Sequence, residues 1–321
     1  MNLIEVKNLV KHYPIYGGVF FREVAKVYAL NGASFSLSSG KTLGIVGESG
    51  SGKSTLAKTL IRIQEPTSGE FLFNEEDFFA KKGKDLQNSR KDIQMIFQDP
   101  YESLDTRQTV LDILTEPFEI HKIGDKKERV QFAKNLLDIV GLPLNALSRF
   151  PHEFSGGQRQ RIGIARALAL NPKMVICDEP VSALDVSVQS QVLNLLLNLQ
   201  ESLNLTYLFI AHDLAVVKHV SDEIIVMYLG YIVEKTSANE IYANPLHPYT
   251  QALISAIPEP STKKNTNRII LQGDIPSPIH PPPGCPFHTR CPYMREKCKE
   301  ELPILNDLSP NHSVACHFPL S

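Results

Sequence analysis

The sequence lacks the features that would place it in a membrane or hold it along nucleic acid. None of its apolar runs approaches the roughly 18 residues of a membrane-spanning helix, so the chain is not expected to span a bilayer by itself. The first residues, MNLIEVKNLVKHYP, contain no basic segment followed by an apolar stretch, so no secretory signal is expected and the cytosol is the expected compartment. A net charge of −2 argues against a broad basic face for nucleic acid.

Cysteine is scarce and unevenly distributed. The chain has 5 cysteines, and four of them follow residue 284: Cys285, Cys291, Cys298 and Cys316. In a reducing compartment, clustered cysteines indicate a metal site before they indicate disulfides. The fifth, Cys177, lies in a short apolar run and is interpreted as a small core residue.

The 321 residues predict about two domains, and 42% hydrophobic residues suffice for a packed core. Short apolar strands alternating with helical segments predict a mostly parallel sheet covered on both faces. Helical spacing between about 105 and 148 predicts an inserted helical region. Eight of the 29 residues from 258 to 286 are proline, which predicts an extended linker or wrapping arm before a small cysteine-bearing module.

The strongest local motif is Gly47-Glu48-Ser49-Gly50-Ser51-Gly52-Lys53-Ser54, which matches the phosphate-loop pattern G-x-x-x-x-G-K-[ST]. Its glycines allow successive backbone N–H groups to turn inward around a phosphate, and the helix that follows favours an anion at its N-terminus. Lys53 is expected to reach the β- and γ-phosphates, and Ser54 to bind Mg²⁺. The nucleotide-binding residues predicted here are Gly47, Ser49, Gly50, Gly52, Lys53, Ser54 and Thr55.

A second motif, Lys-Met-Val-Ile-Cys-Asp-Glu-Pro at 173–180, places two acids at the end of an apolar strand. In a parallel sheet, ligands bind beyond that end of the strands. Asp178 is therefore predicted to hold Mg²⁺, and Glu179 to orient or deprotonate the attacking water.

Between the two motifs lies Phe154-Ser155-Gly156-Gly157-Gln158, followed by an apolar-periodic helix. With this segment the chain resembles the ATP-binding subunits of ABC transporters, whose signature usually reads Leu-Ser-Gly-Gly-Gln; Phe154 replaces the leucine. The resemblance implies a P-loop NTPase core with a mostly parallel sheet, an antiparallel β-subdomain and an inserted α-helical subdomain at about 99–170. It divides the chain into an ATP-binding domain, 1–255, and a C-terminal module, 256–321.

The same resemblance assigns further ATP-site roles. Gln98 corresponds to the Q-loop glutamine, which senses Mg²⁺ and the attacking water, and Asp185 to the D-loop aspartate, which contacts the partner ATPase. His212 corresponds to the switch histidine that holds the γ-phosphate. Ser155, Gly156, Gly157 and Gln158 would face the nucleotide bound by a second ATPase. Tyr13 is the predicted adenine-stacking aromatic, with Tyr16 and Tyr28 as open alternatives.

Several segments resemble the oligopeptide/dipeptide importer branch, among them Phe150–Phe154, Glu179–Ser187 and Pro245–Thr250. The second of these resembles the "F"-type ATPase of such systems, which implies a heterodimer with another ATPase, two membrane permeases and an extracytoplasmic peptide-binding protein at the cytoplasmic face of the membrane. No nucleic acid is expected. Nickel or sugar import remains an alternative, as does, further off, a soluble ABC-type ATPase acting on nucleic acid or ribosomes.

The four late cysteines have the spacing Cys285-x5-Cys291-x6-Cys298-x17-Cys316. Four thiolates can bind zinc or a [4Fe–4S] cluster, and the loose spacing differs from the close pairs usual at zinc sites. Some peptide importers that the chain resembles carry an iron–sulfur cluster in this region. A structural [4Fe–4S] cluster is therefore the prediction, with zinc as the alternative, in which His288, His312 or His317 could replace a thiolate.

Overall fold

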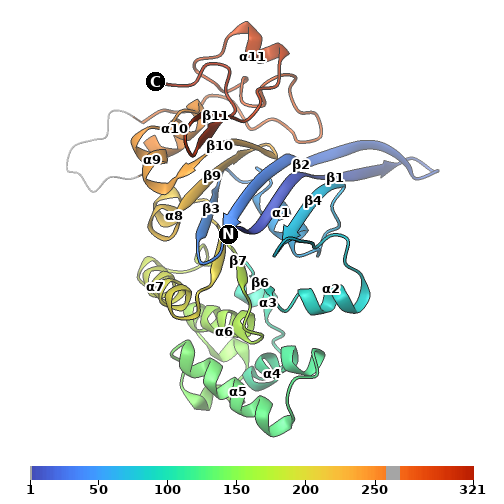
Figure 1. Cartoon of the computed structure of the whole chain (residues 1–321), viewed down its shortest axis with the longest axis vertical. Helices are drawn as coiled ribbons and strands as arrows, with labels where there is room; N and C mark the ends of the chain where they lie inside the picture. Colours follow the sequence, from blue (N-terminus) through green and yellow to red (C-terminus); the bar gives the residue numbers. More distant parts are fainter. Residues whose placement is uncertain (1, 258–267) are drawn as a thin grey trace. The chain divides into compact units, whose positions relative to one another are not determined.

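The computed structural model describes residues 2–257 and 268–321, which form two compact units (Figure 1). Unit 1 contains residues 38–41 and 80–210. Unit 2 contains residues 2–37 and 42–79 and the described residues from 211 onward. Each unit is thus assembled from segments that are distant in sequence. Residues 258–267 of the expected proline-rich linker lie outside the described residues, and the domain boundary expected at 255–256 stays a prediction.

The core of unit 1 is a parallel sheet of three short strands in the order β8-β7-β6. These strands are β6 (Ile93–Ile96), β7 (Met174–Asp178) and β8 (Thr206–Ile210). Every residue of β7 and β8 is buried, which is the pattern of parallel strands covered on both faces. Helix α7 (Val186–Leu203) lies between these two strands in the chain and forms their crossover connection.

The rest of unit 1 is helical, as the spacing over 105–148 predicts. Helices α4 (Val110–Ile120) and α5 (Lys126–Ile139) both begin at capping boxes, in which the cap side chain and the third helical side chain satisfy each other's backbone N–H groups. The remaining elements are α2 (Gly83–Ser89), α3 (Pro100–Ser103), η1 (Leu144–Ser148), η2 (Pro151–Glu153) and α6 (Gly156–Leu168).

Unit 2 contains a mixed sheet in the order β11-β12-β10-β9-β3. Strands β3 (Thr42–Val46) and β9 (Glu223–Tyr228) are parallel, whereas β10 (Tyr231–Ser237), β12 (His312–Val314) and β11 (Asn306–Ser309) add antiparallel pairs. The expectation of a mostly parallel sheet therefore does not hold in unit 2, because these last three strands, which were not predicted, pair antiparallel. The helices of this unit are α1 (Lys53–Leu60), α8 (Leu214–Val220), α9 (Ala238–Ala243), α10 (Pro248–Ser255) and α11 (Glu296–Glu300).

A second sheet in unit 2 has the order β2-β1-β4-β5. It consists of β1 (Asn2–Gly17), β2 (Arg22–Ser38), β4 (Ser68–Phe73) and β5 (Glu76–Asp77), with β4 antiparallel to β1. The stretch at about 15–26, which has no equivalent in the short strands predicted from the sequence, lengthens β1 and β2 into a long hairpin (Figure 1).

Among the helices that the structure describes, none has the length and apolar character needed to cross a lipid bilayer.

Candidate functional site

The phosphate loop of unit 2 runs from the end of β3 into the start of α1, as the sequence predicts. Its backbone requires glycine at two positions with positive φ. A Cβ atom at Gly47 would lie 2.3 Å from the Met227 carbonyl oxygen, and one at Gly52 would lie 2.5 Å from the Ala29 carbonyl oxygen. The loop therefore packs directly against main-chain atoms of its own unit, and no side chain fits at these two positions.

The lysine of this loop is held inside it. Lys53 is only 5% exposed, and its ammonium group donates to the carbonyl oxygens of Gly47 at 2.7 Å and Glu48 at 3.0 Å. The positive charge is thus fixed beside the N-terminus of α1, where the helix dipole also favours an anion. Ser54 and Thr55 follow it in the first turn of the helix and are half-buried. This arrangement is suited to bind the phosphates of a nucleotide.

The three candidate aromatics for adenine stacking lie in β1 and β2. Tyr13 is half-buried, its hydroxyl donates to Gln64, and the Lys11 ammonium lies 4.7 Å from its ring centre. Tyr28 packs edge-on against His12, whereas Tyr16 is 60% exposed on the hairpin. Burial raises the pKa of the Tyr13 hydroxyl, so this side chain is neutral at pH 7. The choice of Tyr13 stays a prediction.

His212 is exposed just after strand β8, and the next residue, Asp213, caps helix α8 by accepting from the Ala215 N–H at 2.8 Å. The histidine is thus placed between a buried strand and a capped helix start. This position agrees with its expected place in the motif order, and its role as a switch stays a prediction.

In unit 1, two predicted catalytic side chains meet. The Gln98 amide donates to the Glu179 carboxylate at 2.9 Å, although 81 residues separate them. Asp178 ends β7 and is 2% exposed, while Glu179 is half-buried with a left-handed backbone, φ 47°. Its N–H group donates to the Ile210 carbonyl oxygen at 2.9 Å. The turn after β7 therefore separates a buried acid from a half-buried one, and their separate roles stay predictions.

The signature segment begins helix α6 with a capping box. Ser155 Oγ accepts from the Gln158 N–H at 3.3 Å, and the Gln158 side-chain oxygen accepts from the Ser155 N–H at 3.0 Å. A Cβ atom at Gly157 would lie 2.4 Å from Val188 Cγ1, so this turn of helix packs tightly on α7. At the start of α6, Ser155 and the capping residue Gln158 are exposed, whereas Gly156 is half-buried.

The predicted D-loop connects β7 to α7. The Gln189 amide of α7 donates to the carbonyl oxygens of Val181 at 3.0 Å and Leu184 at 2.9 Å, which fixes the turn. Asp185 is exposed at the start of α7 and makes no capping hydrogen bond with its side chain. Its carboxylate is therefore presented on the surface of this unit, and its contact with a partner ATPase stays a prediction.

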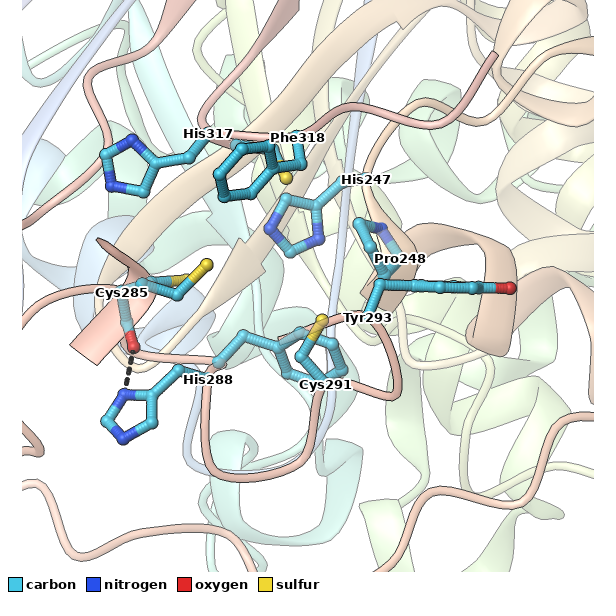
Figure 2. A pocket seen from close by; sticks show the side chains of 11 residues that line it. His247, Pro248, Cys285, His288, Cys291, Tyr293, His317 and Phe318 are labelled. Atoms are coloured by element: carbon cyan, nitrogen blue, oxygen red, sulfur yellow. Dashed lines mark hydrogen bonds between the residues drawn. The ribbon is translucent and has the colours of Figure 1, made fainter. Parts of the chain in front are cut away.

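The four late cysteines all line one pocket in unit 2, together with His247, His288 and His317 (Figure 2). Figure 2 shows the Cys285 and Cys291 sulfur atoms and the His247 ring turned toward the same space. The His288 ring points away from this space, and its Nδ1 lies 2.9 Å from the Cys285 carbonyl oxygen. The free space is about 20 Å³, which is enough for one water molecule or one ion.

Burial in this pocket disfavours the charged forms of Cys285, Cys316 and His247. Burial raises the pKa of Cys285 to about 12 and that of Cys316 to about 11, and it lowers the pKa of His247 to about 3. All five cysteines are free thiols. Within residues 2–257 and 268–321, no group of three or more His, Cys, Asp or Glu side chains is arranged to hold a metal ion as it stands.

Sequence reasoning missed two side chains that contact the phosphate loop. The Arg290 guanidinium donates to both carboxylate oxygens of Glu48, at 2.6 and 3.1 Å, and the Tyr249 hydroxyl accepts from the Glu48 N–H at 2.8 Å. Arg290 follows Glu48 by 242 residues, so no local motif connects them. The only sequence signal was the position of Arg290 directly before Cys291.

A strand, a glycine loop that encloses a lysine, and a helix define the phosphate-binding loop of a P-loop nucleotide-binding protein. Comparison with known proteins agrees with this class. Residues 30–182 match the ABC transporter family, and residues 233–298 match the oligopeptide/dipeptide transporter C-terminal region.

The curated relatives resemble the chain along almost its whole length. The oligopeptide transport ATP-binding protein AppF of Bacillus subtilis is 53% identical over 98% of this chain and 97% of its own. A putative peptide import ATP-binding protein of Brucella ovis is 48% identical over the same shares. A solved dimer of the ATP-binding cassette MJ0796 with ADP and Pi is 28% identical, covers 73% of this chain and 98% of its own, and superposes with a TM-score of 0.65.

The chain therefore belongs to the ATP-binding subunits of the ABC transporter family, in the group with the oligopeptide/dipeptide transporter C-terminal region. It is an ABC ATPase.

Proposed function

We propose that this chain hydrolyses ATP to power the uptake of oligopeptides or dipeptides across the cytoplasmic membrane. The observation that carries the proposal is the continuous 53% identity to an oligopeptide transport ATP-binding protein, which includes the peptide-transporter C-terminal region. A general ABC ATPase would share only the cassette at 30–182. The additional match at 233–298 supports peptides over nickel, sugars or a role on ribosomes.

The phosphate loop supports ATP binding through fixed donors. Lys53 supplies a charge that the loop carbonyls already hold in place, so its ammonium group loses little freedom when phosphate binds. The Ser54 hydroxyl, in the first turn of α1, is the oxygen donor proposed for Mg²⁺ in this unit. Bound Mg²⁺ would neutralise charge that develops on the phosphates.

In unit 1, Glu179 is the proposed general base and Gln98 its orienting partner. Gln98 donates to one carboxylate oxygen, which orients the group that would accept a proton from water. Asp178 and the Gln98 side-chain oxygen are the proposed Mg²⁺ donors of this unit, and His212 of unit 2 is the proposed γ-phosphate sensor.

The proposed partners are a second ABC ATPase in a heterodimer, two membrane permeases and an extracytoplasmic peptide-binding protein. The exposed start of α6 at Ser155 and the exposed Asp185 support the ATPase partner, because neither is covered within unit 1. The dimeric state of the MJ0796 cassette supports the same arrangement. We place the chain at the cytoplasmic face of the membrane, attached through the permeases.

We further propose that Cys285, Cys291, Cys298 and Cys316 hold a [4Fe–4S] cluster that stabilises the C-terminal residues. The support is that four thiols from separate stretches line one pocket, and a buried neutral imidazole lies beside them. The present space of about 20 Å³ suits one ion, so a four-iron cluster requires the thiols to lie farther apart. Zinc is the alternative that the experiment must separate.

Uptake measurements test the transport function. Cells that lack this chain should lose uptake of a labelled dipeptide and tripeptide, and the wild-type chain should restore it. The Glu179→Gln variant should not restore uptake, whereas Glu201→Gln, on the exposed end of α7, should. Loss of nickel or sugar uptake with normal peptide uptake would contradict the peptide assignment.

Metal analysis tests the cluster. Anaerobically purified chain should contain iron and acid-labile sulfide, and Cys298→Ser should lose both, whereas Cys177→Ala in strand β7 should retain them. Stoichiometric zinc without sulfide, or no metal in wild-type protein, would contradict the proposal.

A further inference from the structure

The phosphate loop carries a carboxylate where it is expected to bind an anion. Glu48 is the second residue of the loop, and a free carboxylate there would repel nucleotide phosphates. Arg290 removes this charge by a two-pronged ion pair, with donor–acceptor distances of 2.6 and 3.1 Å. The Arg290 side chain is 7% exposed and the Glu48 side chain 28%, so solvent screens this pair less than it would a surface ion pair.

The main chain of Glu48 is held as firmly as its side chain. Its N–H group donates to the Tyr249 hydroxyl at 2.8 Å, and its carbonyl oxygen accepts from the Lys53 ammonium at 3.0 Å. The position of Glu48 therefore affects the position of Lys53, the lysine expected to bind phosphate. A displacement of Glu48 would move one of the two carbonyl oxygens that accept from the Lys53 ammonium.

Arg290 lies on a segment that is anchored at Cys285 and Phe287, which we call the 285–291 loop. Its N–H group donates to the Phe287 carbonyl oxygen at 3.0 Å, and Phe287 is fully buried with its ring 5.2 Å from Tyr228 and 5.3 Å from Tyr249. Cys285, at the start of the loop, donates its N–H to the Cys298 carbonyl oxygen at 2.8 Å. The segment that carries Arg290 to Glu48 is thus held in place by the burial of Phe287 and by the hydrogen bond at Cys285.

We propose that Arg290 is a positioning residue for ATP binding, which neutralises Glu48 and thereby lets the 285–291 loop set the affinity of the phosphate loop for nucleotide. The proposal rests on ATP binding at the phosphate loop and is independent of the transported substrate. An ion pair that only joined two surface segments would contribute to the stability of the fold and not to ATP binding. The pair between Arg290 and Glu48, in contrast, sets the net charge of the phosphate loop and should change its affinity for ATP.

Nucleotide titrations on the full-length chain test the proposal. Arg290→Gln should raise the Kd for Mg-ATP about tenfold, the scale of losing one charge-assisted pair, and the KM of the assembled transporter should rise equally while kcat changes less than about twofold. The double variant Glu48→Gln with Arg290→Gln should return Kd to within about threefold of wild type, because the unpaired charge is gone. The matched control, Arg295→Gln, removes an arginine that stacks on Phe318 and should bind ATP normally.

Three results would overturn the proposal: an unchanged Kd in Arg290→Gln, a lowered kcat with unchanged KM, or a double variant as weak as the single one. Should Arg290→Gln fail to fold by circular dichroism, Arg290→Lys decides. Lysine keeps the charge without the two-pronged geometry, so Kd should rise about threefold, and no rise over Arg295→Gln would refute the role. Wild-type titration, run in parallel, reports separately on the phosphate loop itself.

Discussion

Replacing Glu179 by glutamine isolates the loss of a base from every other property of the site. Glutamine has the same length and keeps a carbonyl oxygen that can accept the 2.9 Å hydrogen bond from the Gln98 amide. The left-handed backbone of residue 179 costs the same for both side chains, so the turn after β7 should be retained. Only the negative charge and the ability to accept a proton are lost.

The expected loss follows from that single change. A positioned general base contributes about 10²- to 10⁴-fold to a proton transfer, which corresponds to about 3–5 kcal/mol of the barrier. ATP affinity should change less than about threefold, because carbonyl oxygens of the phosphate loop itself hold the Lys53 ammonium in place. We therefore expect kcat to fall at least a hundredfold while ATP remains bound.

Phosphate release and retention of radiolabelled ATP after rapid desalting measure both quantities on one sample. The variant should retain unhydrolysed ATP, whereas the wild-type chain should retain either no nucleotide or only ADP. Glu201→Gln removes an exposed carboxylate from α7 and should match wild type in both assays. Turnover within tenfold of wild type would remove Glu179 from the role of base, and loss of ATP binding would show that its charge serves binding.

Three further substitutions test separate parts of the chain. Lys53→Ala should weaken ATP binding at least about a hundredfold in a fluorescent-nucleotide titration, since it deletes the buried ammonium, whereas Lys58→Ala one turn later should not; equal affinities would contradict the phosphate-loop assignment. Gly157→Ala should lower ATPase activity at least about tenfold because its Cβ would meet Val188 at 2.4 Å, while Gly163→Ala, with open space in the same helix, should keep full activity. Phe287→Ala should destabilise unit 2 by about 3–5 kcal/mol in thermal unfolding, and Phe20→Ala on the exposed hairpin by less than about 0.5 kcal/mol; similar melting of the two would refute the anchoring role of Phe287.

The parts of the fold that local chemistry determines were predictable from sequence. The apolar run before Asp178 located β7, because a strand buried on both faces has few other compositions. The phosphate loop was predictable because positive φ values and close main-chain contacts demand glycine at fixed spacing. The hydrogen bond between Gln98 and Glu179 was only implied by motif order, since no pattern in the sequence gives a contact over 81 residues.

The parts that depend on distant pairing were not predictable. Strand β11 is exposed at all four positions, so it lacks the alternation that marks a strand, and it forms because β12 beside it pairs with β10. The long β1–β2 hairpin was also missed, because its outer residues are exposed or half-buried and none of them is buried. In both cases the neighbouring strand, rather than the local sequence, decides the conformation.

These long-range pairings change what the C-terminal residues are. Composition alone suggests a proline-rich tail joined to a complete cassette, but β12 pairs with β10, and buried His312 lies 2.8 Å from the Glu234 carboxylate. The same carboxylate accepts from the N–H groups of Leu246 and His247 at 2.7 and 2.9 Å, directly before α10 begins. Helix α10 in turn carries Tyr249, whose hydroxyl holds Glu48 in the phosphate loop. A continuous series of buried polar contacts therefore runs from the last strand to the phosphate-binding residues, so unit 2 depends on its C-terminal residues to complete the environment of that loop.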